Sequence, residues 1–122
     1  MISLQMQWWL TTINSKMLYH VVKETHWNTF KKSNLYFSET FDTENFIHLS
    51  EASQIKGVLK RYYKNQNNLL ILCIEKEKLT SDLIYEKATN NDYFPHLYGG
   101  LNINAISKII KGTYLELIDI EL

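Results

Sequence analysis

Cysteine, proline and arginine are scarce in this sequence, since its 122 residues include one of each. The lone Cys73 cannot form an internal disulfide, and its place in the apolar run 69–74 indicates a buried strand residue and favours the cytoplasm. That run is the longest apolar stretch and falls well short of the roughly 18 residues that a membrane-spanning helix needs. Residues 1–16 have no basic start and only a short apolar cluster, so we predict neither export nor membrane insertion.

Net charge is also absent, because 13 Lys and Arg residues balance 13 Asp and Glu residues. No long run of one sign provides the basic footprint of proteins that bind duplex nucleic acid or anionic membranes. The 45% of hydrophobic residues is too high for a disordered chain. A chain of this length can bury a self-sufficient core without a disulfide or a structural metal. We therefore expect one folded domain that is a monomer.

The first sixteen residues differ from the rest of the chain. They contain no acidic residue and follow neither helical nor strand periodicity, whereas a strand-like run begins at Met17. We expect residues 1–16 to be an extension that docks through Trp8 and Trp9 or stays loose, and the domain to span residues 17–122.

Strands and helices both follow from the pattern. Apolar, β-branched and aromatic runs predict strands at residues 18–22, 46–49, 69–74, 83–87 and 113–122. Helical spacing and capping residues predict helices at 26–32 after Thr25, from Ser50 to about Tyr63, and at 104–110 before Gly112. An ordered aromatic loop is expected at 93–100. The fold class is therefore α+β, a single small domain built around a sheet with two or three helices.

Standard phosphate and nucleophile motifs are absent. The paired glycines Gly99 and Gly100 lack the spacing of a dinucleotide or P-loop motif, and no Ser lies on a glycine-flanked elbow.

What the sequence does have is three histidines with apolar or aromatic neighbours, His20, His48 and His96. A desolvated imidazole needs a hydrogen-bond partner, so each one alone is typical of a structural group, whereas three together favour a shared pocket at the strand ends. His26, on a helix, is expected at the surface. Three imidazoles can also bind zinc, but their spacing argues against it, so we expect no metal.

Six phrases in this sequence resemble, in order and spacing, the domain of unknown function 952 family. They are residues 18–22 (LYHVV), 46–50 (FIHLS), 61–63 (RYY), 70–74 (LILCI), 84–86 (IYE) and 94–99 (FPHLYG). The chain departs from the family pattern at Asn45, where Gly is usual, and at Gly100, where Pro is usual. Because Asn tolerates the left-handed conformation, the first change should be mild, whereas the second should loosen a loop.

That family looks like a compact member of the ADP-ribosyltransferase superfamily, which implies a split sheet and NAD as a substrate. The resemblance implies that His20 contacts the ribose on the nicotinamide side, that His48 occupies the second-strand position, and that Glu86 or His96 fills the third. Glu86, His48 and His96 are then the candidate catalytic residues, and the candidate NAD-binding residues are His20, His48, Ser50 and Tyr98. For Ser50 a helix cap is the simpler explanation, and Glu86 is equally well explained as a solvent-facing strand residue.

Aromatic faces are candidates for stacking on nicotinamide or adenine, namely Tyr19, Tyr63, Phe94 and Tyr98. For Tyr63, core packing is the simpler explanation. With Arg61 as the single arginine, a clamp of several arginines on a diphosphate is excluded, so recognition should depend on imidazoles, hydroxyls, aromatic faces and backbone N–H groups.

The leading hypothesis is a domain that binds NAD or an ADP-ribose-containing ligand in a His-lined cleft and cleaves the nicotinamide–ribose bond. The alternatives are a non-catalytic module that binds a small ligand or a protein, and a His-ligated metal hydrolase.

Overall fold

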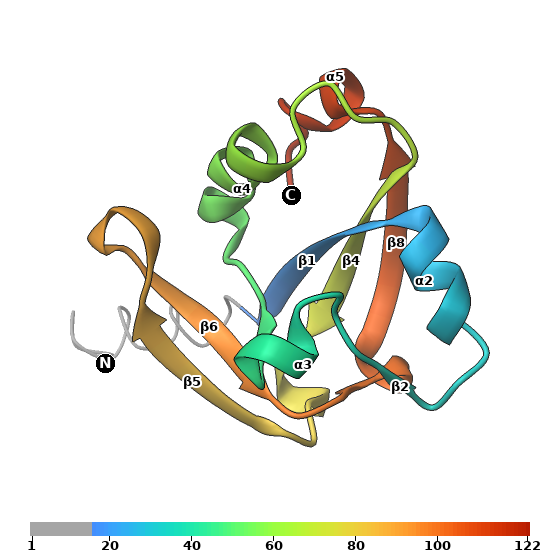
Figure 1. Cartoon of the computed structure of the whole chain (residues 1–122), viewed down its shortest axis with the longest axis vertical. Coiled ribbons are helices and arrows are strands. Elements are labelled where there is room, and N and C mark those ends of the chain that lie inside the picture. Colours follow the sequence, from blue (N-terminus) through green and yellow to red (C-terminus); the bar gives the residue numbers. More distant parts are fainter. Residues whose placement is uncertain (1–15) are drawn as a thin grey trace, which may run out of the picture.

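Two antiparallel three-stranded sheets organise the computed structural model, which describes residues 16–122 (Figure 1). The first sheet has the order β1-β4-β8, from β1 (Met17–Lys23), β4 (Leu69–Glu75) and β8 (Ile106–Gly112). Six consecutive residues of β4, from Leu69 to Ile74, are buried, because this strand is paired on both edges and covered on both faces. The prediction of a central buried strand is confirmed.

The second sheet packs against the first and has the order β3-β6-β5. Its strands are β3 (Ile47–His48), β6 (Tyr93–Tyr98) and β5 (Asp82–Lys87). A further short ladder pairs β2 (Leu35–Tyr36) with β7 (Leu101–Asn102). Tyr19 in β1 and Ser50 just after β3 join the two large sheets by exchanging two backbone hydrogen bonds of 2.8 Å. The expected α+β class, in a small single domain, is confirmed.

Short helices connect these strands. The α-helices are α2 (Glu24–Phe30), α3 (Phe41–Glu44), α4 (Ile55–Tyr62) and α5 (Tyr114–Leu117). The 3-10 turns are η1 (Ala52–Gln54), η2 (Lys76–Lys78), η3 (Thr89–Asn91) and η4 (Ile103–Ala105). No helix within residues 16–122 has the length and apolar character needed to cross a membrane.

Two predicted helix starts are wrong. Thr25 is not a cap, because α2 follows β1 directly at Glu24 and has no side-chain cap. Ser50 is not a cap either, since its backbone is extended and pairs with Tyr19. The chain turns at Glu51, where Gln54 Oε1 accepts a 2.9 Å bond from the Glu51 N–H in a capping box, and α4 begins only after that turn.

The last third of the chain was predicted poorly. Residues 93–100 form mainly the strand β6 rather than a loop, and residues 94–97 are all buried, which hides the alternation of a strand. Residues 106–112 form β8 rather than a helix, and the register shift opposite Cys73 and Ile74 disturbs its period. Residues 113–122 do not form a strand. Thr113 and Glu116 instead make the capping box of α5, with bonds of 2.9 and 3.2 Å.

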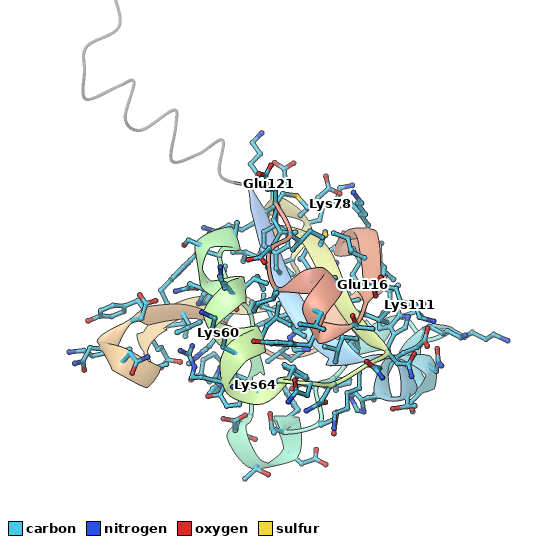
Figure 2. All side chains as sticks on the ribbon, turned by 90° about the horizontal axis from the view of Figure 1, so that it is seen from above. Lys60, Lys64, Lys78, Lys111, Glu116 and Glu121 are labelled. Carbon is cyan, nitrogen blue, oxygen red and sulfur yellow. The ribbon has the colours of Figure 1, made fainter. Side chains whose placement is uncertain are left out.

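The core lies on both faces of the first sheet. One face packs under α2 and the second sheet, with Trp27 and Tyr36 among its buried aromatic residues. The other face packs under α4 and α5, and it includes Tyr19 and Cys73. Charged side chains of both signs are spread over the surface, as the labelled Lys and Glu residues in Figure 2 illustrate.

The two departures from the family pattern have clear local explanations. Asn45 ends α3 with a φ of 66°, so the expected left-handed conformation is confirmed. Gly100, where we expected a looser loop, is buried and closely packed. A Cβ there would lie 2.9 Å from Phe37 Cζ and 3.2 Å from Leu35 Cβ, so the glycine permits a close approach. The predicted N-terminal extension, including Trp8 and Trp9, lies outside the described residues except for Lys16.

Candidate functional site

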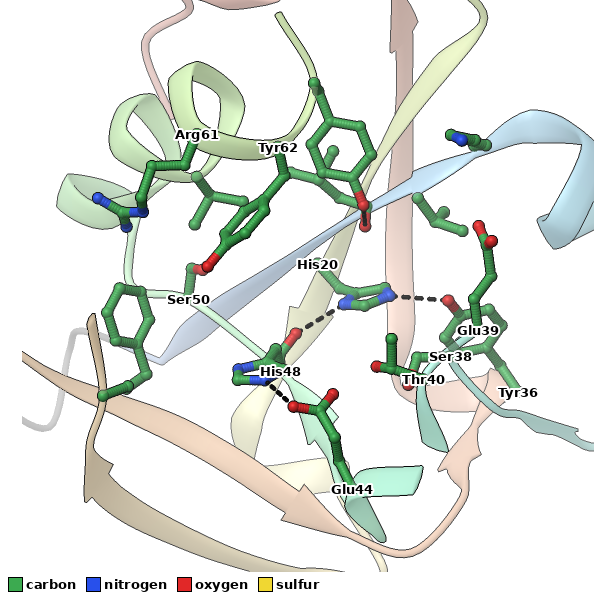
Figure 3. Close-up of a pocket in the computed structure, with 17 residues that line it drawn as sticks. His20, Tyr36, Ser38, Glu39, Thr40, Glu44, His48, Ser50, Arg61 and Tyr62 are labelled. Carbon is green, nitrogen blue, oxygen red and sulfur yellow. Dashed lines mark hydrogen bonds and ion pairs between the residues drawn. The ribbon is translucent and has the colours of Figure 1, made fainter. Parts of the chain in front are cut away.

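A cavity of about 390 Å³ opens between β1, α4, the connection from β2 to α3, and the end of the β5–β6 hairpin (Figure 3). His20 and His48 lie on its floor, and Ser50 lies beside them. Arg61 and Tyr62, both exposed, line its rim from the last turn of α4. Its size falls within the range of about 300–1,000 Å³ that small-molecule pockets occupy.

His20 is fixed by hydrogen bonds at both ring nitrogens. Its Nδ1 lies 2.7 Å from the backbone oxygen of His48, and its Nε2 lies 2.7 Å from the hydroxyl of Tyr36. A carbonyl only accepts, so Nδ1 carries the proton and donates to His48, while Nε2 accepts from Tyr36. Burial lowers the pKa of His20 to about 4 and raises that of Tyr36 above its usual value. Both groups are therefore neutral at physiological pH.

His48 belongs to a carboxylate–imidazole pair at the cavity. Its Nε2 lies 3.1 Å from Glu44 Oε2, four residues earlier in the chain. Partial burial acts to raise the pKa of Glu44, but hydrogen bonds from Thr40 and His48 outweigh it and hold that pKa below its usual value. The His48 side chain is 45% exposed, so its ring is accessible to a ligand.

A second carboxylate–imidazole pair lies next to the first. His96 Nδ1 is 2.8 Å from Glu86 Oε1, and the Tyr98 hydroxyl donates to the same oxygen at 2.5 Å. The hydrogen bonds from Tyr98 and His96 lower the pKa of Glu86. Phe46 covers this cluster, with its ring centroid 4.0 Å from that of His96 and stacked on Tyr98 at 5.3 Å.

The second ring nitrogen of His96, Nε2, is buried and has no hydrogen-bond partner within residues 16–122. Because a carboxylate accepts, Nδ1 carries the proton in the neutral ring and Nε2 is an acceptor.

The structure thus separates the predicted site residues into two neighbouring groups. His20, His48 and Ser50 line the cavity. Glu86, His96 and Tyr98 do not line it, but they join it through the contact between the His48 and His96 rings, whose centroids are 4.7 Å apart.

The remaining aromatic candidates are divided in the same way. Tyr63 and Phe94 line the cavity, and the Tyr63 hydroxyl also donates to the Val21 carbonyl at 3.2 Å. Tyr19 lies in the core on the α4 side of the first sheet and does not line the cavity. His26 is half-buried rather than a surface residue, since its Nε2 donates to the Phe37 carbonyl at 2.7 Å.

Residues 16–122 hold no group of three or more His, Cys, Asp or Glu side chains arranged to bind a metal. His48 and His96 are close to each other, but the nearby carboxylates of Glu44 and Glu86 are each hydrogen-bonded to one of these imidazoles.

Several polar and aromatic lining residues were not predicted from the sequence, among them Tyr36, Ser38, Glu39, Thr40, Glu44 and Tyr62. Glu44 and His48 are four residues apart, but α3 ends at Glu44 and His48 lies in β3, so no helical spacing indicated this pair. Tyr36 lies in the short strand β2, and Ser38 and Glu39 lie in the connection that follows it, which has no motif. From the sequence, Arg61 served only to exclude a clamp of several arginines on a diphosphate. In the structure it lines the cavity.

The fold and the cavity define a small α+β domain with a ligand-sized cleft between two sheets. The chain belongs to the family described as "Protein of unknown function (DUF952)", whose model matches residues 21–109. The family resemblance inferred from the sequence is therefore confirmed.

Solved structures with the same fold are those of protein CC0527 from Caulobacter crescentus. Two crystal structures, one of a double mutant, have a TM-score of 0.73 with 23% and 22% identity, and each match covers 85% of this chain and 99% of that chain. A solution NMR structure has a TM-score of 0.67 with 27% identity, over 78% of this chain and 83% of that chain. No curated protein matches the chain.

Proposed function

We propose that the cleft binds NAD or another ligand that contains ADP-ribose. The observation that carries this proposal is a cavity of about 390 Å³ in which imidazole, hydroxyl, aromatic and guanidinium groups from separate elements converge. This set matches the parts of a nucleotide, since aromatic faces stack on bases, hydroxyls and imidazoles bind ribose, and a guanidinium binds phosphate. The similarity to ADP-ribosyltransferases that the family phrases imply is part of this proposal.

His20 has a positioning role in this proposal. Both of its ring nitrogens already bind protein groups, so it holds the backbone of His48 and the hydroxyl of Tyr36 in place. His48 and Ser50 are the groups that contact the ribose, because both line the cavity and the His48 ring is partly exposed.

Cleavage of the nicotinamide–ribose bond is the reaction that Glu86 would support. As nicotinamide leaves with the bonding electrons, positive charge develops on the ribose, and a water or acceptor hydroxyl then forms the new bond to C1′ and loses its proton. A carboxylate stabilises that charge, and the hydrogen bonds from Tyr98 and His96 keep Glu86 ionised. Since Glu86 lies outside the cavity lining, the ribose must reach past His48.

Titration calorimetry with ADP-ribose and NAD tests binding, and nicotinamide release from NAD tests cleavage. H48A should weaken binding, and E86Q should stop release without weakening binding. E121Q, which changes an exposed carboxylate near the C-terminus, is the matched control and should change neither. Absence of binding by the wild-type protein would rule the proposal out.

A binding module without catalysis is the second candidate function. The position of Glu86 outside the cavity lining favours it, because a ligand confined to the cavity would not meet a carboxylate that stabilises the ribose charge. This candidate predicts ADP-ribose binding with no nicotinamide release.

A further inference from the structure

The single arginine stands at one end of the cavity without a carboxylate partner. Arg61 lines the cavity from the last turn of α4, and no Asp or Glu of the described region lies within ion-pair distance of its guanidinium. Its guanidinium lies 5.9 Å from the ring centroid of Tyr62, which also lines the cavity. A planar fork of donors beside an aromatic face suits a phosphate that is attached to a base or a sugar.

Gly57 gives this guanidinium its place. A Cβ at residue 57 would lie 3.3 Å from Arg61 Nη1 and 3.4 Å from Nη2, and the three atoms nearest to it all belong to that guanidinium. Glycine is unfavourable inside a helix, and here its missing side chain leaves room for the arginine to fold back over α4. A cation in the last turn of a helix is favoured by the helix dipole, but this does not explain the position of Arg61. Lys60 in the same turn supplies such a cation equally well and does not line the cavity.

The opposite end of the cavity has the chemistry of a sugar site. Ser38 and Glu39 line it from the connection between β2 and α3, and Figure 3 shows Glu39 on the far side of the cavity from Arg61. The Ser38 hydroxyl is buried and has no hydrogen-bond partner among residues 16–122. A carboxylate and an unpartnered hydroxyl that line the same end of a cavity are suited to ribose hydroxyls, as an acidic residue is in other nucleotide sites.

We infer that the cleft accepts a phosphorylated nucleoside in one orientation, with its phosphate at Arg61 and a ribose diol at Ser38 and Glu39. This inference rests on the proposed function and adds to it the orientation of the ligand and two specificity-determining ends. It assigns the negative charge of the ligand to the α4 side and its hydroxyl groups to the α3 side.

Calorimetric titrations of ADP-ribose, ADP and adenosine test the phosphate end. R61Q should weaken ADP-ribose and ADP by roughly tenfold to a hundredfold, the range for a lost charged hydrogen bond, and should leave adenosine binding unchanged. R61K should retain part of the affinity, because it keeps the charge and loses the fork. K60Q is the matched control, since it removes an adjacent cation that does not line the cavity.

Two further variants test the arrangement. G57A should not lower the melting temperature, because its Cβ meets only the flexible guanidinium, and it should weaken ADP-ribose binding less than R61Q does, because the guanidinium needs to shift only slightly. E39Q should weaken ADP, yet should not further weaken 2′,3′-dideoxy-ADP, which has no diol to lose. D42N on the neighbouring helix α3 is the control for E39Q, because Asp42 is exposed and does not line the cavity.

The outcomes separate this inference from the proposed function. If the wild-type protein binds none of these ligands, both are overturned. If it binds ADP-ribose and R61Q behaves like K60Q, or if R61Q weakens adenosine as much as ADP, the proposed function stands and the orientation is wrong. If E39Q weakens the dideoxy ligand as strongly as ADP, the diol assignment is wrong.

Discussion

His48 and His96 lie directly opposite each other on β3 and β6, with their ring centroids 4.7 Å apart and their planes at 82°. Each imidazole pairs with a different carboxylate, His48 with Glu44 and His96 with Glu86. The two carboxylates come from separate elements on either side of the histidine pair. This contact therefore connects the open cavity to the cluster that Phe46 covers.

The stability of the fold should depend on the protonation of His20. Its pKa falls from 6.5 to about 4 on folding, so the unfolded chain binds the proton more tightly. The stabilisation is complete above pH 6.5 and is lost as the pH falls from 6.5 toward 4, with an upper limit of about 3 kcal/mol at 1.36 kcal/mol for each pH unit. Urea unfolding at a series of pH values measures this slope.

H20N is the variant for this test, and its stability should change less between pH 6.5 and 5 than that of the wild type. Glu44 and Glu86, whose pKa values are lowered, contribute only as the pH falls below the usual carboxyl range, so their effects lie at lower pH. Equal slopes for H20N and the wild type between pH 6.5 and 5 would contradict the assignment.

G57A should stabilise the isolated protein. Glycine inside a helix costs about 0.5–1 kcal/mol relative to alanine, and the new Cβ meets only the flexible end of Arg61. The free energy of unfolding in urea should rise by about that amount. G112A is an informative comparison, because a Cβ there would lie 3.0 Å from the packed Leu117 side chain and should not bring the same gain.

Asn45 should tolerate glycine better than alanine. Its φ of 66° lies in the left-handed region, which costs an ordinary residue roughly 1–2 kcal/mol. N45G should therefore match or exceed the wild-type stability, whereas N45A should lose about 1 kcal/mol. Chemical denaturation of the three proteins decides the matter, and an N45A protein as stable as N45G would show that φ is not the constraint.

Y98F should raise the pKa of Glu86. The Tyr98 hydroxyl donates to the ionised carboxylate and is the largest cause of its lowered pKa, so its removal favours the protonated acid. An NMR titration that follows the Glu86 side-chain carboxyl measures this directly. Y93F removes another exposed hydroxyl from β6 and should leave that pKa unchanged.

The sequence predicted the strands whose burial is uniform or whose boundaries are marked. The run 69–74 could be identified as a central strand because both of its faces are apolar. Residues 106–110 could not be identified as a strand, because their isoleucines have helical spacing. They form a strand through tertiary pairing with the edge of β4. The alternation of residues 113–122 predicted a strand, whereas Thr113 and Glu116 have the spacing of the capping box that begins α5.

The candidate site was predicted in part, because sequence reveals unusual residues better than it reveals their neighbours. His20, His48 and Ser50 could be identified from their apolar surroundings and the family phrases, and the fold brings them to one cavity. Tyr36 could not be paired with His20 in advance, since their hydrogen bond joins strands of different ladders. The same holds for Arg61, whose approach to the cavity depends on how α4 is placed.

The joint between the sheets brings His20 and His48 together through backbone hydrogen bonds, and the His20 side chain adds one bond to the His48 carbonyl. Tyr19 and Ser50 are joined by backbone atoms, and His20 and His48 lie one and two residues away from them. Substitutions can therefore alter the chemistry of the cleft without moving the scaffold that aligns it. Such a joint, made by backbone atoms, does not depend on the identity of the two side chains at its centre.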